Sequence, residues 1–298
     1  MEYHKSVLLK ESVDGLEVKP GGIYLDVTYG GGGHSREILK RLGDGRLFAF
    51  DQDEDASRNI TEDSRFTLIN ANFRYMSNFM KFHKADKLDG IIADLGISSF
   101  QIDNPERGFS TRFEGNLDMR MDAKGMLSAV DVLSSYELPE LTKVFREYGE
   151  LVNAYRISVK ICDARSEGPI DTIGQLKDLL LPFAERGKEN KFFAKVFQAL
   201  RIEVNDEIGA LKAFLEQSAE LLKTGGRLVV ISYHSLEDRL VKNYIKAGNF
   251  EGTIEKDFYG NQLRIFNPVT RKPIVPDEKE IEANSRARSA KLRIAEKI

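Results

Sequence analysis

Four consecutive glycines at residues 30–33 follow a short apolar run, and they constrain the fold of this 298-residue chain more than any other feature. The apolar run, residues 22–28, has the length and composition of a buried strand, and residues 35–42 have the pattern of a helix. Glycine lets a backbone turn sharply and approach a ligand with no Cβ in the way. A strand, a glycine turn and a helix in this order are typical of the ligand-binding edge of an open α/β sheet.

Three further apolar runs continue this pattern, at residues 46–51, 66–70 and 88–95. Continuous apolar strands separated by helical segments indicate a parallel sheet that is covered on both faces. After about residue 115 the pattern changes to helices without a clear strand, and strand signal returns at residues 227–233. The sequence therefore predicts a discontinuous α/β domain, formed by residues 1–112 and 205–298. A helical domain, residues 113–204, is inserted after its fourth strand.

The later part of the chain gives several local expectations. A long apolar stripe runs from Phe193 to Leu222 with a break near Asn205, which is typical of a helical core face. The pair at residues 225–226 is Gly-Gly, which is expected to end that helix. Further helices are expected at 140–148, 151–164 and 173–184, a helix that begins at Ser235, and edge strands at 253–266 and 291–295.

Composition restricts the class of protein. Hydrophobic residues make up 41% and charged residues 31%, which suits a globular protein with a sizeable core. No run approaches the roughly 18 apolar residues of a membrane span, and no apolar signal core follows the N-terminus. The single cysteine, Cys162, excludes an internal disulfide. We therefore expect a cytoplasmic protein with no membrane partner.

Metal chemistry is not expected. The four histidines and one cysteine show no paired ligand spacing, so a zinc site is disfavoured. Asp118 and Asp122 are four residues apart and could share a helix face. A solvated or capped pair is favoured there over a magnesium site.

The ligand of the glycine turn can be narrowed from the residues. A dinucleotide site needs glycine or alanine five residues after the first glycine, but that place is Ser35 counted from Gly30 and Arg36 counted from Gly31. S-adenosylmethionine lacks a pyrophosphate, and its amino-acid end can lie on glycine backbone. An acid at the end of the second strand can accept hydrogen bonds from both ribose hydroxyls, and Asp51 stands there. The turn therefore predicts S-adenosylmethionine and a methyltransferase, with a tight turn of surplus glycines as the alternative.

The fourth strand ends at residues 94–99, Asp-Leu-Gly-Ile-Ser-Ser. In this fold class the residue at that tip faces the transferring methyl group, so Asp94 could accept a hydrogen bond from an amine and orient it for in-line attack. Alternatively, Asp94 contacts only the cofactor or caps the next turn. The Pro-Pro-aromatic platform of many base-modifying amino methyltransferases is missing here, so another group must stack the base. The candidates are Phe100, Phe109 and Tyr233.

Eight short blocks form an ordered set along the chain, at residues 4–9, 29–35, 94–99, 105–110, 117–122, 197–202, 232–239 and 284–289. Together they resemble the bacterial small-subunit (16S) ribosomal RNA cytosine-N4 methyltransferases, the RsmH or MraW family. The resemblance implies a Rossmann-like class I S-adenosylmethionine-dependent methyltransferase sheet. It also implies methylation of N4 of a cytidine in the decoding region of small-subunit ribosomal RNA. The expected partner is that RNA within an assembled or assembling subunit, and the sequence leaves the oligomeric state open, with a homodimer as one option.

The same resemblance implies site residues. It implies cofactor contacts at Gly32, Gly33, His34, Asp51, Phe73, Asp94 and Gln101. The helical insertion would help to hold RNA. Two positions depart from the family pattern: Gly31 stands where relatives often carry a basic residue, and Tyr233 where many carry phenylalanine.

The C-terminal fifteen residues are basic, although the whole chain has a net charge of −3. Charge alone favours a solvated surface there over a phosphate contact. The family block at 284–289 gives weight to phosphate contacts by Arg286, Arg288 and Arg293.

Other functions remain to be compared with this prediction. The broken glycine pattern disfavours a nucleotide-dependent dehydrogenase. A ribosome-assembly factor that binds RNA without methylating it is a non-enzymatic alternative. A methyltransferase acting on a protein or a small-molecule amine is the other alternative.

Overall fold

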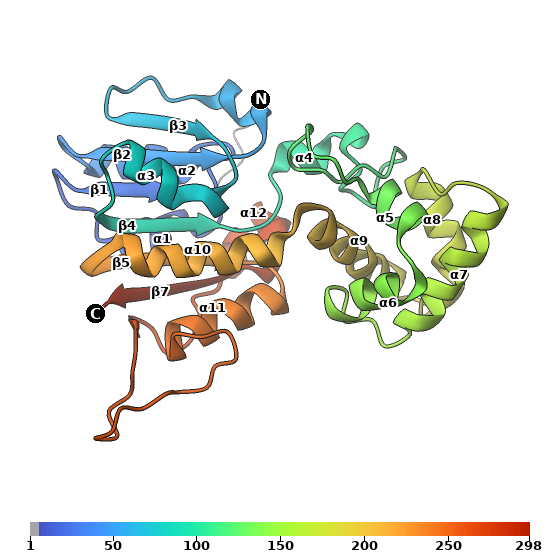
Figure 1. Cartoon of the computed structure of the whole chain (residues 1–298). Helices are drawn as coiled ribbons and strands as arrows, with labels where there is room; N and C mark the ends of the chain where they lie inside the picture. The colour runs from blue at the N-terminus through green and yellow to red at the C-terminus, as the bar shows by residue number, and fades with distance from the viewer. Residues whose placement is uncertain (1–5) are drawn as a thin grey trace. The chain divides into compact units, whose positions relative to one another are not determined.

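The computed structural model of the chain describes residues 6–298 (Figure 1). His4 and Lys5 of the first family block lie outside the described residues. The chain forms two compact units, Met1–Gly96 with Gly209–Ile298, and Ile97–Ile208. The second unit follows the fourth strand and contains the expected insertion, 113–204, within wider bounds.

The first unit is built on a seven-stranded sheet with the order β3-β2-β1-β4-β5-β7-β6. The strands are β1 (Ile23–Asp26), β2 (Arg46–Asp51), β3 (Phe66–Asn70), β4 (Leu88–Asp94), β5 (Leu222–Ser232), β6 (Phe266–Pro268) and β7 (Lys291–Lys297). Strands β1 to β5 are parallel, and β7 is antiparallel to both β5 and β6. Because β1 pairs with both β2 and β4, the strand order reverses there, which is where open α/β sheets bind ligands. The predicted α/β class, Rossmann-like sheet and helical insertion are confirmed.

Two apolar cores lie on opposite faces of this sheet. Successive strand residues point to opposite faces, so β4 contributes Ile91 to one core and Ile92 to the other. The first core includes buried residues of α3 (Met76–Phe82), α10 (Glu207–Leu221) and α11 (Ser235–Ala247). The second includes residues of α1 (Leu9–Leu16) and α2 (Gly33–Arg41). Burial on both faces explains why the strands are apolar without polar alternation.

The second unit is helical and has its own core. Its helices are α4 (Ser99–Asp103), α5 (Ala129–Ser135), α6 (Leu138–Glu147), α7 (Ala154–Glu167), α8 (Ile173–Leu180) and α9 (Glu189–Asn205). Phe145 of α6 is fully buried there, among Ile157 of α7 and Leu200 of α9. Asp206, which has a left-handed φ of 45°, separates α9 from α10, so the break expected near Asn205 is confirmed.

Three local predictions were wrong. The helix α10 ends at Leu221, and the glycines at 225–226 lie inside β5, where they form a bulge rather than a helix end. Leu88 pairs with Leu222 and Gly90 with Arg227, so the intervening residues are displaced from the ladder. Helix α8 ends at Leu180 instead of continuing to 184, because a 3-10 turn containing Pro182 follows. Of residues 253–266, only Phe266 joins the sheet.

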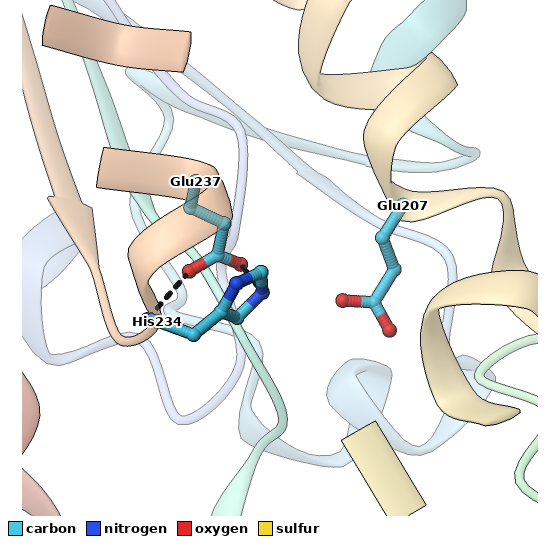
Figure 2. A group of neighbouring side chains, drawn as sticks. All are labelled: Glu207, His234 and Glu237. Carbon is cyan, nitrogen blue, oxygen red and sulfur yellow. Dashed lines mark hydrogen bonds and ion pairs between the residues drawn. The ribbon is translucent and has the colours of Figure 1, made fainter. Parts of the chain in front are cut away.

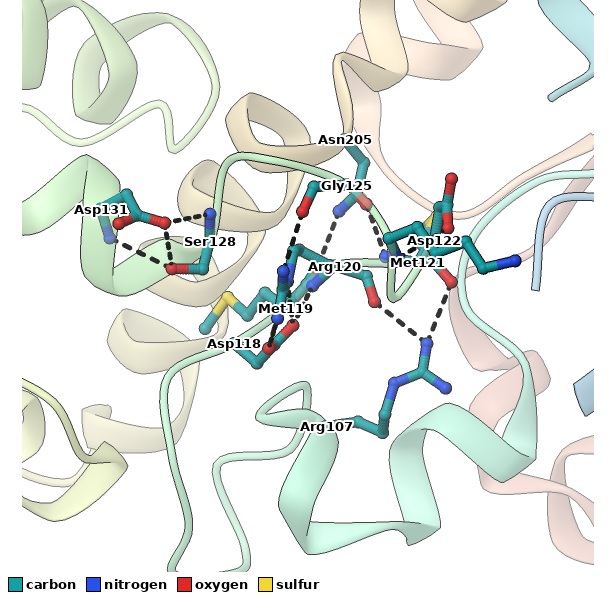
Figure 3. A network of polar contacts seen from close by, with 11 residues as sticks. Arg107, Asp118, Met119, Arg120, Met121, Asp122, Gly125, Ser128, Asp131 and Asn205 are labelled. Atoms are coloured by element: carbon teal, nitrogen blue, oxygen red, sulfur yellow. Dashed lines mark hydrogen bonds and ion pairs between the residues drawn. The ribbon is translucent and has the colours of Figure 1, made fainter. Parts of the chain in front are cut away.

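Asp118 and Asp122 do not share a helix face, because their segment is irregular and is held by a polar network (Figure 3). Met119 has a left-handed φ of 60°, and Asp118 forms a 2.6 Å ion pair with Arg120. The side chain of Asn205 accepts a hydrogen bond from the Met121 amide and donates one to the Met119 carbonyl. This family block is therefore shaped by a partner more than eighty residues away in sequence. No helix within residues 6–298 is long and apolar enough to cross a membrane.

We expect Phe145→Ala to lower the free energy of unfolding by about 3–5 kcal/mol, because it leaves a cavity in a fully buried site. Chemical denaturation followed by circular dichroism would measure the loss. Tyr155→Ala in the same unit removes a ring that is 57% exposed and should change stability by about 0.5 kcal/mol or less. Equal effects of the two substitutions would contradict the assignment of Phe145 to a packed core.

Candidate active site

Three aspartates end neighbouring parallel strands: Asp26 ends β1, Asp51 ends β2 and Asp94 ends β4. Because β1 lies between β2 and β4, the three carboxyl groups share one edge of the sheet. Burial raises the pKa of Asp26 and Asp51 to about 6 and that of Asp94 to about 7. Repulsion from the charge of Asp26 is a smaller contribution to the raised pKa values of Asp51 and Asp94. This edge therefore gathers acids whose protonation changes near neutral pH.

The glycine turn lies against this edge. Gly30 has a φ of 51°, and its amide donates a 2.8 Å hydrogen bond to Oδ2 of Asp51. A Cβ at Gly30 or Gly31 would meet nothing within 4 Å, so the backbone there is open to a ligand. A Cβ at Gly32 would instead lie 2.7 Å from the Tyr29 hydroxyl, and one at Gly33 would overlap Ser6. The first two glycines leave space outside the protein, and the last two allow close packing within it.

His34 lies in the first turn of α2 and is buried. Its Nε2 is 3.2 Å from the Val7 carbonyl oxygen, which assigns the ring proton to Nε2 and leaves a lone pair on Nδ1. Nδ1 is 3.9 Å from Oδ2 of Asp94. Burial lowers the pKa of His34 to about 4, so the ring is neutral at pH 7 and this approach is not an ion pair. His34 therefore presents an acceptor at the edge of the sheet.

Asp94 is held in one orientation by two contacts. The Tyr233 hydroxyl donates a 2.7 Å hydrogen bond to its Oδ1, and its own amide donates to Oγ1 of Thr28 at 2.6 Å. Gly96 has a φ of 114°, and a Cβ there would lie 3.3 Å from the Tyr233 ring. The Asp94 side chain keeps 22% of its surface exposed. Asp94 is therefore both oriented and accessible, so its carboxylate can accept a hydrogen bond from an incoming amine.

Tyr233 is itself fixed by the start of α11, where Glu237 is buried. Figure 2 shows the Glu237 carboxylate beside His234. The Glu237 carboxylate accepts hydrogen bonds from the amides of Tyr233, at 2.9 Å, and His234, at 3.3 Å. His234 Nε2 also lies 3.1 Å from Glu237 Oε1. This carboxylate therefore sets the backbone from which the Tyr233 ring reaches Asp94. Glu207, also drawn, belongs to the second unit, where it pairs with Arg201 at 2.8 Å.

The remaining predicted cofactor residues lie in different parts of the chain. Phe73 starts a 3-10 turn shortly after β3, and its ring meets Phe214 edge to face at 5.7 Å. Gln101 belongs to the second unit, where its Oε1 accepts a 3.0 Å hydrogen bond from the Ser98 amide as part of a capping box. The first unit therefore contains the other six predicted residues, while Gln101 makes a structural contact with Ser98 at the start of α4. Of the stacking candidates in the second unit, Phe109 is buried and Phe100 is 45% exposed.

The three candidate RNA-binding arginines differ in their surroundings. Arg286 and Arg288 lie in the 3-10 turn Ser285–Ser289, and Arg288 is exposed. Arg293 lies in β7 and donates a 2.7 Å hydrogen bond to Asp238. Burial opposes ionisation of Asp238, but the contacts with Arg293 and Lys291 outweigh it and lower its pKa. Arg293 is therefore engaged inside the protein.

Sequence reasoning assigned no role to Asp26 or Thr28, and it proposed Tyr233 only as a ring that stacks the base, not as a hydrogen-bond donor to Asp94. Asp26 could have been found, because it is the last residue of the strand that precedes the glycines. The contact between Tyr233 and Asp94 joins residues 139 positions apart, and no spacing rule gives it. Asp26 accepts hydrogen bonds from Ser35 at 2.7 Å and from the Thr28 amide at 3.1 Å.

The whole chain, residues 1–298, matches the model of the MraW methylase family. The chain belongs to this family. A relative from Christiangramia forsetii is 58% identical and covers 100% of this chain and 99% of its own length. Relatives from Amoebophilus asiaticus and Bacteroides thetaiotaomicron are 57% and 56% identical, covering 99% and 100% of this chain and 96% and 98% of their own. All three are named ribosomal RNA small subunit methyltransferase H. The predicted family and enzyme class are confirmed, and the MraW methylase assignment agrees with S-adenosylmethionine as the methyl donor.

In this MraW methylase, we expect Tyr233→Phe to raise the pKa of Asp94, because it removes a hydrogen bond that stabilises the ionised carboxylate. Hydrogen bonds to charged groups are worth about 1.5–3 kcal/mol, which corresponds to a rise of about one to two pH units. Titration of the carboxyl carbon of Asp94 by nuclear magnetic resonance would measure it. Tyr244→Phe, at a buried tyrosine that stacks on Phe250, is the control and should leave Asp94 unchanged. A Tyr233→Phe titration identical to wild type would contradict the assignment.

Proposed function

We propose that this methylase transfers the methyl group of S-adenosylmethionine to N4 of a cytidine in the decoding region of small-subunit ribosomal RNA. The observation that carries the proposal is the oriented, partly exposed carboxylate of Asp94 beside a glycine turn that is open to a ligand. The relatives' name supports the class of substrate. The resemblance seen in the sequence supports the cytidine and its N4 atom.

The first unit offers groups that fit the cofactor. The open backbone at Gly30 and Gly31 suits the amino-acid end of S-adenosylmethionine, beside the proposed contacts at Gly32, Gly33 and His34. The amides of Gly30 and Asp53 donate hydrogen bonds to different oxygens of Asp51, and each oxygen has the capacity to accept another. The ribose hydroxyls would donate these additional hydrogen bonds to Asp51. Phe73 would contact the adenine, and Gln101 and Asp94 complete the proposed set.

In this reaction the main role of the protein is to orient the cytosine amine toward the methyl carbon. When bound, S-adenosylmethionine supplies a methyl carbon that is activated by the adjacent sulfonium. The cytosine amine is a weak nucleophile because its lone pair is conjugated with the ring. Asp94 would accept one amine N–H, which turns the lone pair toward the methyl carbon, and its pKa of about 7 lets it take the released proton. The Tyr233 hydroxyl would hold Asp94 in place during this step.

The proposed partner is the ribosomal RNA within an assembled or assembling small subunit, in the cytoplasm. The domain bounds expected from the sequence, 113–204 for the substrate-binding part, stay part of this proposal. The second unit carries both cations and acids on its helices and has a folded core of its own, which suits a wall beside RNA better than a basic platform. Association into a homodimer stays a prediction from the sequence.

The decisive experiment incubates the protein with labelled S-adenosylmethionine and undermodified small subunits, and then maps the labelled nucleotide. We expect label on N4 of one cytidine. Asp94→Asn should lower turnover by about 10²- to 10⁴-fold, the range typical of a lost proton-transfer group, with a much smaller change in cofactor affinity. Asp89→Asn is the control, because Asp89 lies at the opposite end of β4 and pairs with Lys223.

The outcomes separate the alternatives. Cofactor binding without transfer to any subunit would favour the assembly factor, and label on protein would favour a different amine substrate. Normal turnover of Asp94→Asn at saturating cofactor and subunit would show that Asp94 does not orient the amine.

We also expect joint neutralisation of Arg286 and Arg288 to weaken subunit binding and to flatten its salt dependence. Each lost phosphate contact should lower the slope of log affinity against log salt by about 0.7–0.9. Filter binding at several salt concentrations measures this slope. The control neutralises Arg46 and Lys223, which lie near the amino-terminal starts of β2 and β5, away from the candidate site. Unchanged slopes for the Arg286 and Arg288 variant would remove these residues from the interface.

A further inference from the structure

The segment between α11 and β6 has no role in the site described above. Residues 253–265, here called the C-terminal hairpin, form a narrow loop that extends away from the sheet (Figure 1). Lys256 and Gln262 form an antiparallel bridge, and the Leu263 amide donates a 2.9 Å hydrogen bond to the Glu255 carbonyl. The two legs are therefore paired with one another over residues 255–263, and Ile265 at the base accepts a 3.2 Å hydrogen bond from the Ile298 amide, just after β7.

The base of the hairpin is fixed to the first unit. Before it, Phe250 stacks on Tyr244 of α11 with ring centroids 5.1 Å apart, and Asn249 donates a 2.7 Å hydrogen bond to the Thr253 carbonyl. After it, Phe266 is fully buried in the core of the sheet. Both legs consequently leave from anchored positions.

The tip is ordered by one carboxylate. Asp257 accepts hydrogen bonds from the amides of Tyr259, at 2.9 Å, and Asn261, at 2.8 Å, and from the Asn261 side chain at 2.9 Å. These hydrogen bonds lower the pKa of Asp257, so it is ionised at neutral pH. Gly260 has a φ of 86°, which a tight turn requires. The negative charge of Asp257 is used to close the turn.

Two aromatic rings stand at this ordered tip. Phe258 is 97% exposed and Tyr259 is 85% exposed, with ring centroids 5.6 Å apart and planes at 88°. Rings of this size usually enter a core, where burial is favourable. A turn that is built by its own hydrogen bonds and presents both rings to solvent is instead suited to contact a partner.

The surrounding charge indicates the kind of partner. Within the hairpin, the cations Lys256 and Arg264 are exposed and flank the two rings in the sequence. Its two carboxylates are Glu255 and Asp257, and Asp257 is used in the turn. Two further exposed cations, Arg271 and Lys272, follow β6. Exposed aromatic rings flanked by cations are the means by which proteins bind unpaired nucleotides, with rings on bases and cations near phosphates.

We propose that the C-terminal hairpin is an RNA-binding element, in which Phe258 and Tyr259 stack on unpaired bases of small-subunit RNA and Lys256 and Arg264 contact its phosphates. This proposal rests on the proposed function for its substrate. It adds a binding surface outside the edge formed by Asp26, Asp51 and Asp94.

The test is the double substitution Phe258→Ala with Tyr259→Ala in the full chain. We expect the dissociation constant for undermodified small subunits to rise about 10-fold or more, since stacking on an aromatic ring contributes substantially for each base. Turnover at saturating subunit and affinity for S-adenosylmethionine should stay within about two-fold of wild type. Phe258→Tyr with Tyr259→Phe keeps both rings and should restore binding. Phe82→Ala, which removes an 80% exposed ring of α3, is the matched control.

Binding of the double alanine variant within two-fold of wild type would overturn the proposal. So would a loss of binding to vesicles rich in phosphatidylglycerol with subunit binding unchanged, because the rings would then serve a membrane surface. Direct subunit binding and the labelling of cytidine are separate readouts. If wild type binds subunits through the hairpin but labels no cytidine, the proposed function fails and the hairpin assignment stands.

Discussion

The hydrogen bond from the Gly30 amide to the Asp51 carboxylate joins the glycine turn to the neighbouring strand, and the geometry of the candidate site depends on it. Gly30 and Gly32 both take left-handed backbone angles, which only glycine adopts without strain. The carboxylate fixes such a flexible turn by accepting its first amide. The next residues can then enter α2 with His34 already directed at the edge of the sheet.

The same edge is costly to build, because it removes three carboxyl groups from water. Each has a folded pKa above its unfolded value, near 4, so each contributes stability that is present below pH 4 and is lost as pH rises through 6 to 7. The two apolar cores on the faces of the sheet must offset this loss at neutral pH. A ligand that donates hydrogen bonds to the ionised oxygens reverses part of it, so the unfavourable burial of the acids favours ligand binding.

Much of this arrangement was accessible from the sequence. The strands at 46–51 and 66–70 have the predicted bounds, because each is a short run rich in apolar and β-branched or aromatic residues, although most of the second strand is only half-buried. Asp51 and Asp94 followed from their places at strand ends. What could not be predicted depends on distant partners. Hydrogen bonds from Asn205 shape the segment around Asp118. Pairing with β4 places the glycines at 225–226 inside a strand. The two legs of the segment 253–265 pair with one another.

The ring and the hydroxyl of Tyr233 have two different roles. Its ring packs against Gly96, which has the backbone angle that a side chain rarely adopts, and a phenylalanine ring could do the same. Only the hydroxyl reaches Asp94, where burial alone would favour the protonated acid and the hydrogen bond opposes it. The packing therefore builds the edge of the sheet in either case, whereas the hydroxyl adjusts how readily Asp94 is ionised.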